Sequence, residues 1–372
     1  MSAANKLFTW KKPYELKKTD TLFLQAMQEN VRHHYENSPD YARILDEKGF
    51  HPDDLREYDD LRKIPFIPTL YFKRHTMFSV PEKRLLIKAT SSGTSGRRSL
   101  IGFNGSSLYR GLRMVLSLCK YHRLISLKPV HYIILGYEPA RSNPSAITKT
   151  TFGQTLFAPA LSRDYALKYT KEGYKLDLED LKQKLIRFSQ SKYPVRMTGF
   201  PAYTYFLLKQ MKEEGICVKL PKGSLMSLGG GWKQFYAEKI TKQDFYELAE
   251  EVLGIDDQYT VEFFSAVEHP VLYVDCRCHH FHVPVYSRII IRDVDSLEPV
   301  PAGQVGLINL LTPMVDSVPL ASVMTDDLGI LHDEKCPCGV DSPWLEILGR
   351  VGIKDIVTCA AGAQEMLSAK ER

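Results

Sequence analysis

The sequence lacks the features that would place the protein in a membrane, outside the cell or on a nucleic acid. No apolar run approaches the roughly 20 residues that cross a bilayer, and residues 1–12 lack the apolar stretch of a secretion signal. The 49 Lys and Arg nearly balance the 44 Asp and Glu, whereas a nucleic-acid binder concentrates basic residues on one face. We therefore expect a cytoplasmic protein with no membrane span and no nucleic-acid partner.

Cysteine is scarce, and its number argues against a disulfide framework. The chain has 7 cysteines in 372 residues, an odd number in a protein long enough to build its own hydrophobic core. We expect these thiols to be reduced, so that some are available as metal ligands or nucleophiles. Internal repeats, low-complexity tracts and long Pro/Gly/Ser linkers are also missing, so nothing marks an independent second domain.

The segments that are present follow an order typical of an α/β protein. Helical segments are predicted over 20–63, with a break at Ser38-Pro39, and over 108–121, 177–190, 202–214 and 233–253. Strands are predicted over 85–89, 130–137 and 195–201, and short β runs over 273–275, 288–292 and 305–311. Asp20 is the expected N-cap of the first helix. Strands that alternate with helices and then give way to a strand-rich end indicate an α/β fold.

A run of hydroxyl residues and glycines is the strongest local signal. Thr90-Ser91-Ser92-Gly93-Thr94-Ser95-Gly96 contains only Thr, Ser and Gly, and Arg97 and Arg98 follow directly. Glycines let backbone N–H groups converge on an anion, and hydroxyls add further donors. The GxxxxGK[ST] loop is excluded because no Lys stands at its required place. From the residues alone, the run is either a phosphate-binding loop or a solvated surface loop.

Four further segments follow this run in a defined order. They are Gly229-Gly230-Gly231, Phe264-Ser265-Ala266-Val267-Glu268, Thr325-Asp326-Asp327-Leu328-Gly329 and Leu348-Gly349-Arg350. The series, which spans residues 90–350, resembles the adenylate-forming superfamily of acyl-CoA synthetases and firefly-luciferase-like enzymes. Residues 38–41 and 61–66 also look like the phenylacetate-CoA ligase branch. The resemblance implies mixed sheets with flanking helices and a β-rich C-terminal part.

This resemblance implies a ligase that activates a carboxylic acid with ATP and Mg²⁺ to give an acyl-adenylate and pyrophosphate. Residues 90–96 would cover the β- and γ-phosphates, and Glu268 would hold Mg²⁺, a hard cation that suits a carboxylate. Asp327 would accept the ribose hydroxyls, with Arg350 near the same sugar and phosphate. Residues 229–231 would let the backbone approach the adenine and acyl groups closely.

The chain departs from the superfamily pattern in two places. Ser99 stands near the place of the lysine that closes the phosphate loop, so the two arginines would substitute for it. The usual C-terminal domain with its catalytic lysine is strongly shortened: either this branch manages without that lysine, or Lys354 or Lys233 partly replaces it. We therefore expect a catalytic domain over 1–347, with a helical N-terminal part over 1–80, and a short tail over 348–372.

The tail narrows the resemblance to one branch. Leu348-Gly349-Arg350-Val351-Gly352-Ile353-Lys354, followed by Cys359, is similar to the end of bacterial acyl-protein synthetases of the LuxE type, and residues 229–233 agree. This implies that a long-chain fatty acid passes from AMP to Cys359 as a thioester. A reductase-type partner then receives the acyl group, as in the fatty acid reductase complex of bioluminescence. Alternatively, Cys359 is only a small buried residue.

Two other functions remain open from the sequence. A stand-alone ligase would transfer the acyl group to coenzyme A or a carrier protein and would not need Cys359. A scaffold subunit would keep the fold without the chemistry, although Glu268, Asp327 and Arg350 argue against that reading. Apolar residues at 200–211 indicate either an acyl pocket or plain core.

Four cysteines and three histidines gather in two short segments. They are Cys276-Arg277-Cys278-His279-His280-Phe281-His282 and Cys336-Pro337-Cys338-Gly339. Since Cys-x-Cys places two sulfurs on one tight turn, the segments form either a tetrahedral metal site or a set of unliganded side chains. Related ligases carry similar segments that look like zinc sites. That resemblance assigns Cys276, His282, Cys336 and Cys338 as structural ligands, with Cys278 or His280 as substitutes, in a site that pins the Asp327 loop.

Overall fold

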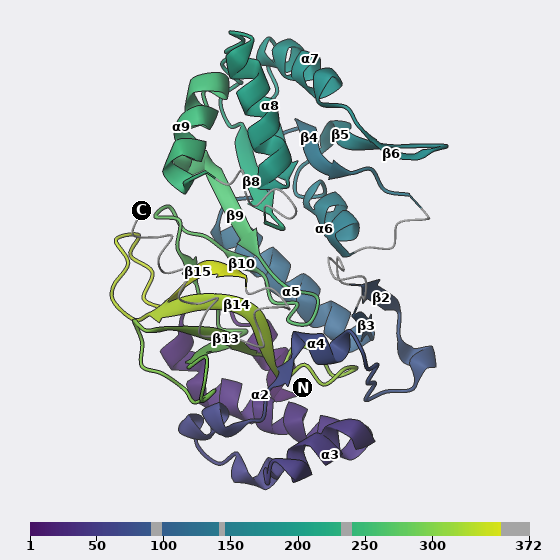
Figure 1. The fold of residues 1–372 in the computed structure, drawn as a ribbon, viewed down its shortest axis with the longest axis vertical. Coiled ribbons are helices and arrows are strands. Elements are labelled where there is room, and N and C mark those ends of the chain that lie inside the picture. Colours follow the sequence, from purple (N-terminus) through teal and green to yellow (C-terminus); the bar gives the residue numbers. More distant parts are fainter. Residues whose placement is uncertain (91–98, 141–145, 232–239, 351–372) are drawn as a thin grey trace. The chain divides into compact units, whose positions relative to one another are not determined.

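The computed structural model describes residues 1–90, 99–140, 146–231 and 240–350, which form two compact units (Figure 1). Unit 1 comprises Met1–Leu118, Ser265–Tyr273 and the described residues from His280 onward. Unit 2 comprises Cys119–Phe264 and Val274–His279. Among the helices of the described ranges, none combines the length and the apolar character that crossing a bilayer requires.

Unit 2 is built on a sheet with the strand order β10-β9-β8-β7-β4-β5-β6. Its strands are β4 (Val130–Tyr137), β5 (Ala160–Thr170), β6 (Gly173–Leu176), β7 (Val195–Gly199), β8 (Leu225–Gly229), β9 (Thr260–Phe264) and β10 (Tyr273–Val274). Its helices are α6 (Ala146–Gln154), α7 (Leu178–Ser189), α8 (Pro201–Glu213) and α9 (Lys242–Leu253), with a 3-10 turn, η5, at Asp257–Tyr259. Strands β5, β4, β7, β8 and β9 are parallel, and β6 is antiparallel to β5. The predicted strands at 130–137 and 195–201 are confirmed.

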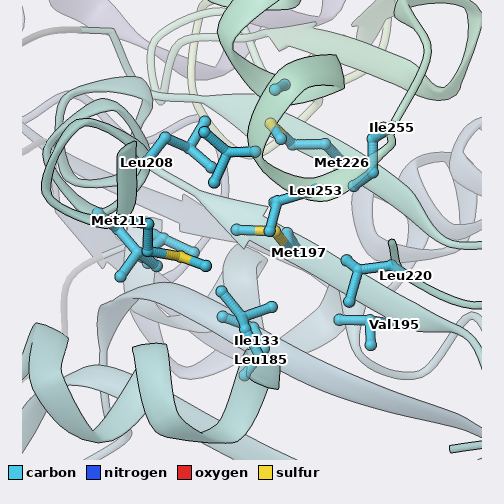
Figure 2. Close-up of a cluster of buried hydrophobic side chains, with 14 of the residues drawn as sticks. Ile133, Leu185, Val195, Met197, Leu208, Met211, Leu220, Met226, Leu253 and Ile255 are labelled. Atoms are coloured by element: carbon cyan, nitrogen blue, oxygen red, sulfur yellow. The ribbon is translucent and has the colours of Figure 1, made fainter. Parts of the chain in front are cut away.

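Side chains of β4 alternate between two buried clusters. Ile133 and Leu135 join α7, α8 and α9 in the main cluster, whereas Tyr132 and Ile134 pack in a smaller one. This period of two is that of a strand covered on both faces, which explains why its sequence is a continuous apolar run. Figure 2 shows the main cluster, in which Leu208 and Met211 of α8 meet Met197 and Met226. The apolar stripe at 200–211 therefore supplies core residues.

Unit 1 begins with helical segments and ends in a largely antiparallel sheet. The helical segments are α1 (Ala3–Phe8), α2 (Leu16–Asn37), α3 (Pro39–Glu47), η1 (Pro52–Asp54), η2 (Tyr58–Lys63), α4 (Thr69–Phe72), η3 (Glu82–Arg84) and α5 (Gly105–Tyr121). The strands are β1 (Ile67–Pro68), β2 (Ile87–Thr90), β3 (Leu100–Phe103), β11 (Phe281–His282), β12 (Arg288–Arg292), β13 (Val305–Leu311), β14 (Ser322–His332) and β15 (Trp344–Arg350). The main sheet has the order β11-β15-β14-β13-β12, and β1 pairs with β14.

The predicted helical stretch at 20–63 forms several shorter elements with the expected break at Ser38-Pro39, but its predicted N-cap is wrong. Helix α2 begins at Leu16, one turn before Asp20, because Leu16 and Thr19 already belong to its buried face. Asp20 instead accepts a hydrogen bond from the guanidinium of Arg288 at 2.8 Å. Helix α2 ends at Asn37, with Ser38 as its C-cap, and proline at the first position of α3 starts a new helix.

Candidate active site and metal site

The described segments on either side of 91–98 contain two paired strands of unit 1. Strand β2 ends at Thr90, whose Cα partner in the antiparallel strand β3 is Leu100. Thr90 Oγ1 is buried and has no hydrogen-bond partner among the described residues. Ser91, Ser92, Gly93, Thr94, Ser95 and Gly96 lie outside the described residues. The hairpin thus fixes where the run leaves and re-enters the fold.

Glu268 lies against the end of this hairpin. Ser99, the first described residue after the run, donates a short hydrogen bond from its hydroxyl to Oε1 of Glu268, 169 residues away in sequence. Both residues are buried, Ser99 at 0% and Glu268 at 5% exposure. Within the described residues no Lys or Arg forms an ion pair with this carboxylate, although a buried carboxylate is costly without a cation. The position therefore suits a residue that holds a metal ion.

A buried histidine next to Glu268 anchors its segment, and the sequence analysis did not identify it. Nε2 of His269 lies 3.2 Å from both Tyr273 Oη and Ser287 Oγ, and those two hydroxyls are 2.7 Å apart. Ser287 in turn donates to the carbonyl of Leu311 at 2.9 Å. Burial lowers the pKa of His269 to about 3, so the ring is neutral. These bonds tie the Glu268 segment to the main sheet of unit 1.

Asp327 and Arg350 are brought together by strand pairing. They are Cα partners on the antiparallel strands β14 and β15. The N–H of Asp327 donates to Thr325 Oγ1 at 3.2 Å, and that hydroxyl donates to the carbonyl of Ile308 at the same distance. A Cβ on Gly329 would come within 2.6 Å of the carbonyl oxygen of Glu346, so this motif position requires glycine. The motif is therefore shaped by the close approach of β14 to its neighbours.

The glycines at 229–231 lie in unit 2, at a place where ligands bind in related folds. Gly229 is the last residue of β8 and pairs with Phe263 of β9. Gly230 and Gly231 have φ of +82° and +68°, which glycine adopts without strain. In this parallel sheet β5 lies on one side of β4, whereas β7, β8 and β9 follow on the other side. Open α/β sheets bind ligands outside the carboxyl ends of the strands at such a switch point. Lys233 lies outside the described residues.

The predicted zinc ligands form one compact group. One ligand atom from each of Cys276, His282, Cys336 and Cys338 lies within 4.8 Å of the other three. In unit 1, Nε2 of His282 is 3.2 Å from the sulfur of Cys338. The proposed substitutes, Cys278 and His280, are not part of the group of four.

The protonation of His282 suits a metal ligand. Its Nδ1 lies 2.9 Å from the carbonyl oxygen of Ser342, which only accepts hydrogen bonds, so Nδ1 carries the proton and Nε2 keeps its lone pair. Burial lowers the pKa of His282, which favours the neutral ring. A ring held in this way by a backbone carbonyl is the usual arrangement of zinc-binding histidines. None of the six cysteines within the described ranges is in a disulfide bond.

Comparison with known proteins identifies the family. The sequence matches the family described as "Acyl-protein synthetase, LuxE" over residues 3–368. The chain belongs to this family. Its LuxE-family relatives include two proteins named long-chain-fatty-acid–luciferin-component ligase. The one from Vibrio harveyi is 26% identical over 96% of this chain and 91% of its own length. The one from Aliivibrio fischeri is 28% identical over 90% of this chain and 86% of its own length.

Solved structures confirm the fold of this LuxE-family chain. An open conformation of 2-hydroxyisobutyryl-CoA ligase, in complex with 2-HIB-AMP and CoA, superposes with a TM-score of 0.67 at 17% identity. The match covers 91% of this chain and 76% of that chain. The expected adenylate-forming α/β fold is therefore confirmed, and the chain is an enzyme of the ligase class.

Proposed function

We propose that the protein activates a long-chain fatty acid with ATP and stores the acyl group on Cys359. A carboxylate oxygen of the acid attacks the α-phosphorus, the bond to the β-phosphate breaks, and pyrophosphate leaves. The Cys359 thiolate then attacks the acyl carbon, and AMP leaves as the C–O bond breaks. The hydrogen bond from Ser99 to Glu268 supports the proposal most directly, because Ser99 follows the Ser/Thr/Gly run by three residues and contacts the acidic motif.

The residues of unit 1 have separate roles in the first step. Residues 90–96 bind the β- and γ-phosphates, and Glu268 holds Mg²⁺, which neutralises charge on the phosphate oxygens when bound. Asp327 accepts the ribose hydroxyls, and Arg350 lies near the same sugar and phosphate. In unit 2, residues 229–231 leave room for the adenine and acyl groups.

The second step depends on residues outside the described ranges, and their roles rest on the resemblance. Lys354, five residues before Cys359, would lower the pKa of its thiol and so increase the reactive thiolate. Lys233 or Lys354 would replace the lysine of the superfamily's C-terminal domain. A reductase-type partner protein then takes the acyl group from Cys359.

The Cys/His group is proposed to hold a structural zinc ion. Cys276, His282, Cys336 and Cys338 supply three sulfurs and one nitrogen, a donor set that zinc binds tetrahedrally with no open position. Cys336 and Cys338 lie in the connection from β14 to β15. The ion therefore pins one end of the strand pair that carries Asp327 and Arg350.

The experiment compares acyl transfer with adenylation in the Cys359→Ser variant. We expect this variant to lose retention of labelled fatty acyl groups while it keeps acid-dependent exchange of labelled pyrophosphate into ATP. Cys217→Ser, at an exposed cysteine of unit 2, is the matched control and should retain both. Loss of both activities in Cys359→Ser would contradict a separate acceptor role. Full turnover with coenzyme A in that variant would favour the stand-alone ligase.

A further inference from the structure

His280 lies beside the proposed zinc ligands without being one of them. Its Nδ1 is 3.3 Å from the sulfur of Cys336. The four ligand atoms that lie within 4.8 Å of one another come from other residues. A zinc-bound sulfur is a thiolate and only accepts hydrogen bonds, so in the loaded site this contact is an N–H···S hydrogen bond from His280.

Aromatic stacking fixes the His280 ring in this position. The ring lies flat on Trp344, with centroids 3.6 Å apart and planes 4° apart. On its other side Trp344 stacks on His332, at 3.8 Å and 8°. The two nitrogens of His332 are held by Glu334 at 3.0 Å and Glu346 at 3.1 Å. The indole is 9% exposed, so the stack is a packed part of unit 1.

The stack also holds the loop that carries two of the ligands. His332 is the last residue of β14 and Trp344 the first of β15, and the two are Cα partners across the strands. Cys336 and Cys338 lie in the connection between them. Stacking of His332 on Trp344 therefore closes the base of this loop, and stacking of His280 on Trp344 sets the ring against the loop's first sulfur.

We propose that His280 is an outer-shell residue of the metal site, which donates its Nδ1–H to the Cys336 thiolate and increases the affinity for Zn²⁺. Three thiolates around a divalent ion leave one excess negative charge, and an N–H donor offsets part of it. Loss of such outer-shell partners typically costs about 10- to 100-fold in metal affinity. The inference rests on the proposed metal site and is independent of fatty acid activation.

Three variants of the full chain separate the hydrogen bond from the stack. His280→Phe keeps a flat ring on Trp344 but removes the donor. His280→Asn keeps an N–H donor near the position of Nδ1 but removes the ring. His332→Phe preserves the stack on the far side of Trp344 and is the matched control. The zinc dissociation constant is measured by chelator competition, and the ligand set by the thiolate-to-cobalt charge-transfer band after Co²⁺ substitution.

We expect His280→Phe to bind one zinc ion per chain about 10- to 100-fold more weakly than wild type, with an unchanged tetrahedral cobalt spectrum. His280→Asn should recover most of this loss, and His332→Phe should bind as wild type does. Wild-type affinity in His280→Phe, or no recovery in His280→Asn, would overturn the donor role. An altered cobalt spectrum in His280→Phe would make His280 a ligand instead. A wild-type protein that binds no metal would overturn the site, whatever its ligase activity.

Discussion

The main apolar cluster of unit 2 and the buried polar groups of unit 1 depend on different interactions, although each unit buries side chains of both kinds. The main cluster of unit 2, around Leu185 and Leu208, consists only of aliphatic and aromatic residues. Unit 1 buries His34, Glu268, His282 and Arg288, each with a named hydrogen-bond partner. Apolar packing tolerates substitutions of similar volume, whereas a buried polar group depends on its specific partner. The main cluster of unit 2 is thus stabilised by burial, whereas the buried polar groups of unit 1 include most of those proposed to act on ATP and zinc.

Removal of the metal should have the largest effect on stability, and this effect should differ between the two units. A ligand present at 1,000 times its dissociation constant stabilises the folded state by about 4 kcal/mol. We expect chelation to lower hydrogen-exchange protection of β14 and β15 in unit 1 and to leave β4 and β7 of unit 2 unchanged. Equal loss of protection in both units would contradict the distinction between them.

Truncation of the unit 2 core should have the next largest effect. Leu208→Ala removes a fully buried side chain and should lower the free energy of unfolding by about 2–5 kcal/mol. Leu156→Ala, at a 65% exposed position of the same unit, should change it by less than about 0.5 kcal/mol. Urea titration gives both values. A similar cost for the two variants would refute an apolar core as the source of stability.

A polar contact in unit 1 should be worth less than a core leucine. Arg288 donates to Asp20 at 2.8 Å and to Tyr58 at 2.6 Å, and its guanidinium lies 4.2 Å from the ring centroid of Phe23. Arg288→Met should cost about 1–3 kcal/mol, because the partners are left without a donor. The exposed Arg43 makes a surface pair with Asp40, so Arg43→Met should cost less than about 1 kcal/mol.

A matched double variant sharpens this result. If Arg288 acts through Asp20, the cost of Arg288→Met should shrink in an Asp20→Ala background, since that acceptor has already gone. Strictly additive costs in urea titrations would mean that Arg288 stabilises unit 1 through its other contacts, such as Tyr58 and Phe23.

Unit 1 should also show a pH dependence of its stability. His34 is fully buried between Ser79 Oγ at 2.7 Å and the Val315 carbonyl at 3.0 Å, and burial lowers its pKa to about 3. The unfolded chain binds a proton near pH 6.5. This contribution to stability is therefore complete above pH 6.5 and declines by about 1.4 kcal/mol per unit as the pH falls toward 3.

The variant His34→Gln removes this titration. Its free energy of unfolding, measured from pH 6.5 to 4.5, should fall less steeply than that of wild type by about one proton's slope. Identical slopes for the two proteins would show that His34 is protonated in the folded state over this range.

Local patterns predicted strands with continuous apolar runs well and strands with interrupted runs poorly. The continuous apolar run at 130–137 is typical of a strand buried on both faces, and it forms β4. Strands β5 and β6, over 160–176, were not predicted, because exposed and charged residues interrupt their apolar pattern. Asp20 failed as an N-cap because its partner, Arg288, is 268 residues away.

The candidate sites divide in the same way. The Cys-x-Cys pair at 336–338 was a local pattern that predicted the metal group. Within that group the structure favours His282 over His280. The bond from Ser99 to Glu268 and the stack of His280 on Trp344 could not be predicted, because each joins side chains that lie far apart in sequence. Such contacts depend on the assembled sheet and leave no local signal.

The most direct test is the exchange of labelled pyrophosphate into ATP in the presence of long-chain fatty acids, with wild type and Glu268→Gln side by side. The account predicts acid-dependent exchange by the wild-type protein. It predicts a loss of about 100-fold in the variant, since a bound Mg²⁺ contributes several kcal/mol of charge stabilisation. No exchange by wild type with any acid, or equal exchange by the two proteins, would contradict the proposal that the hydroxyl-rich run and Glu268 act together on ATP.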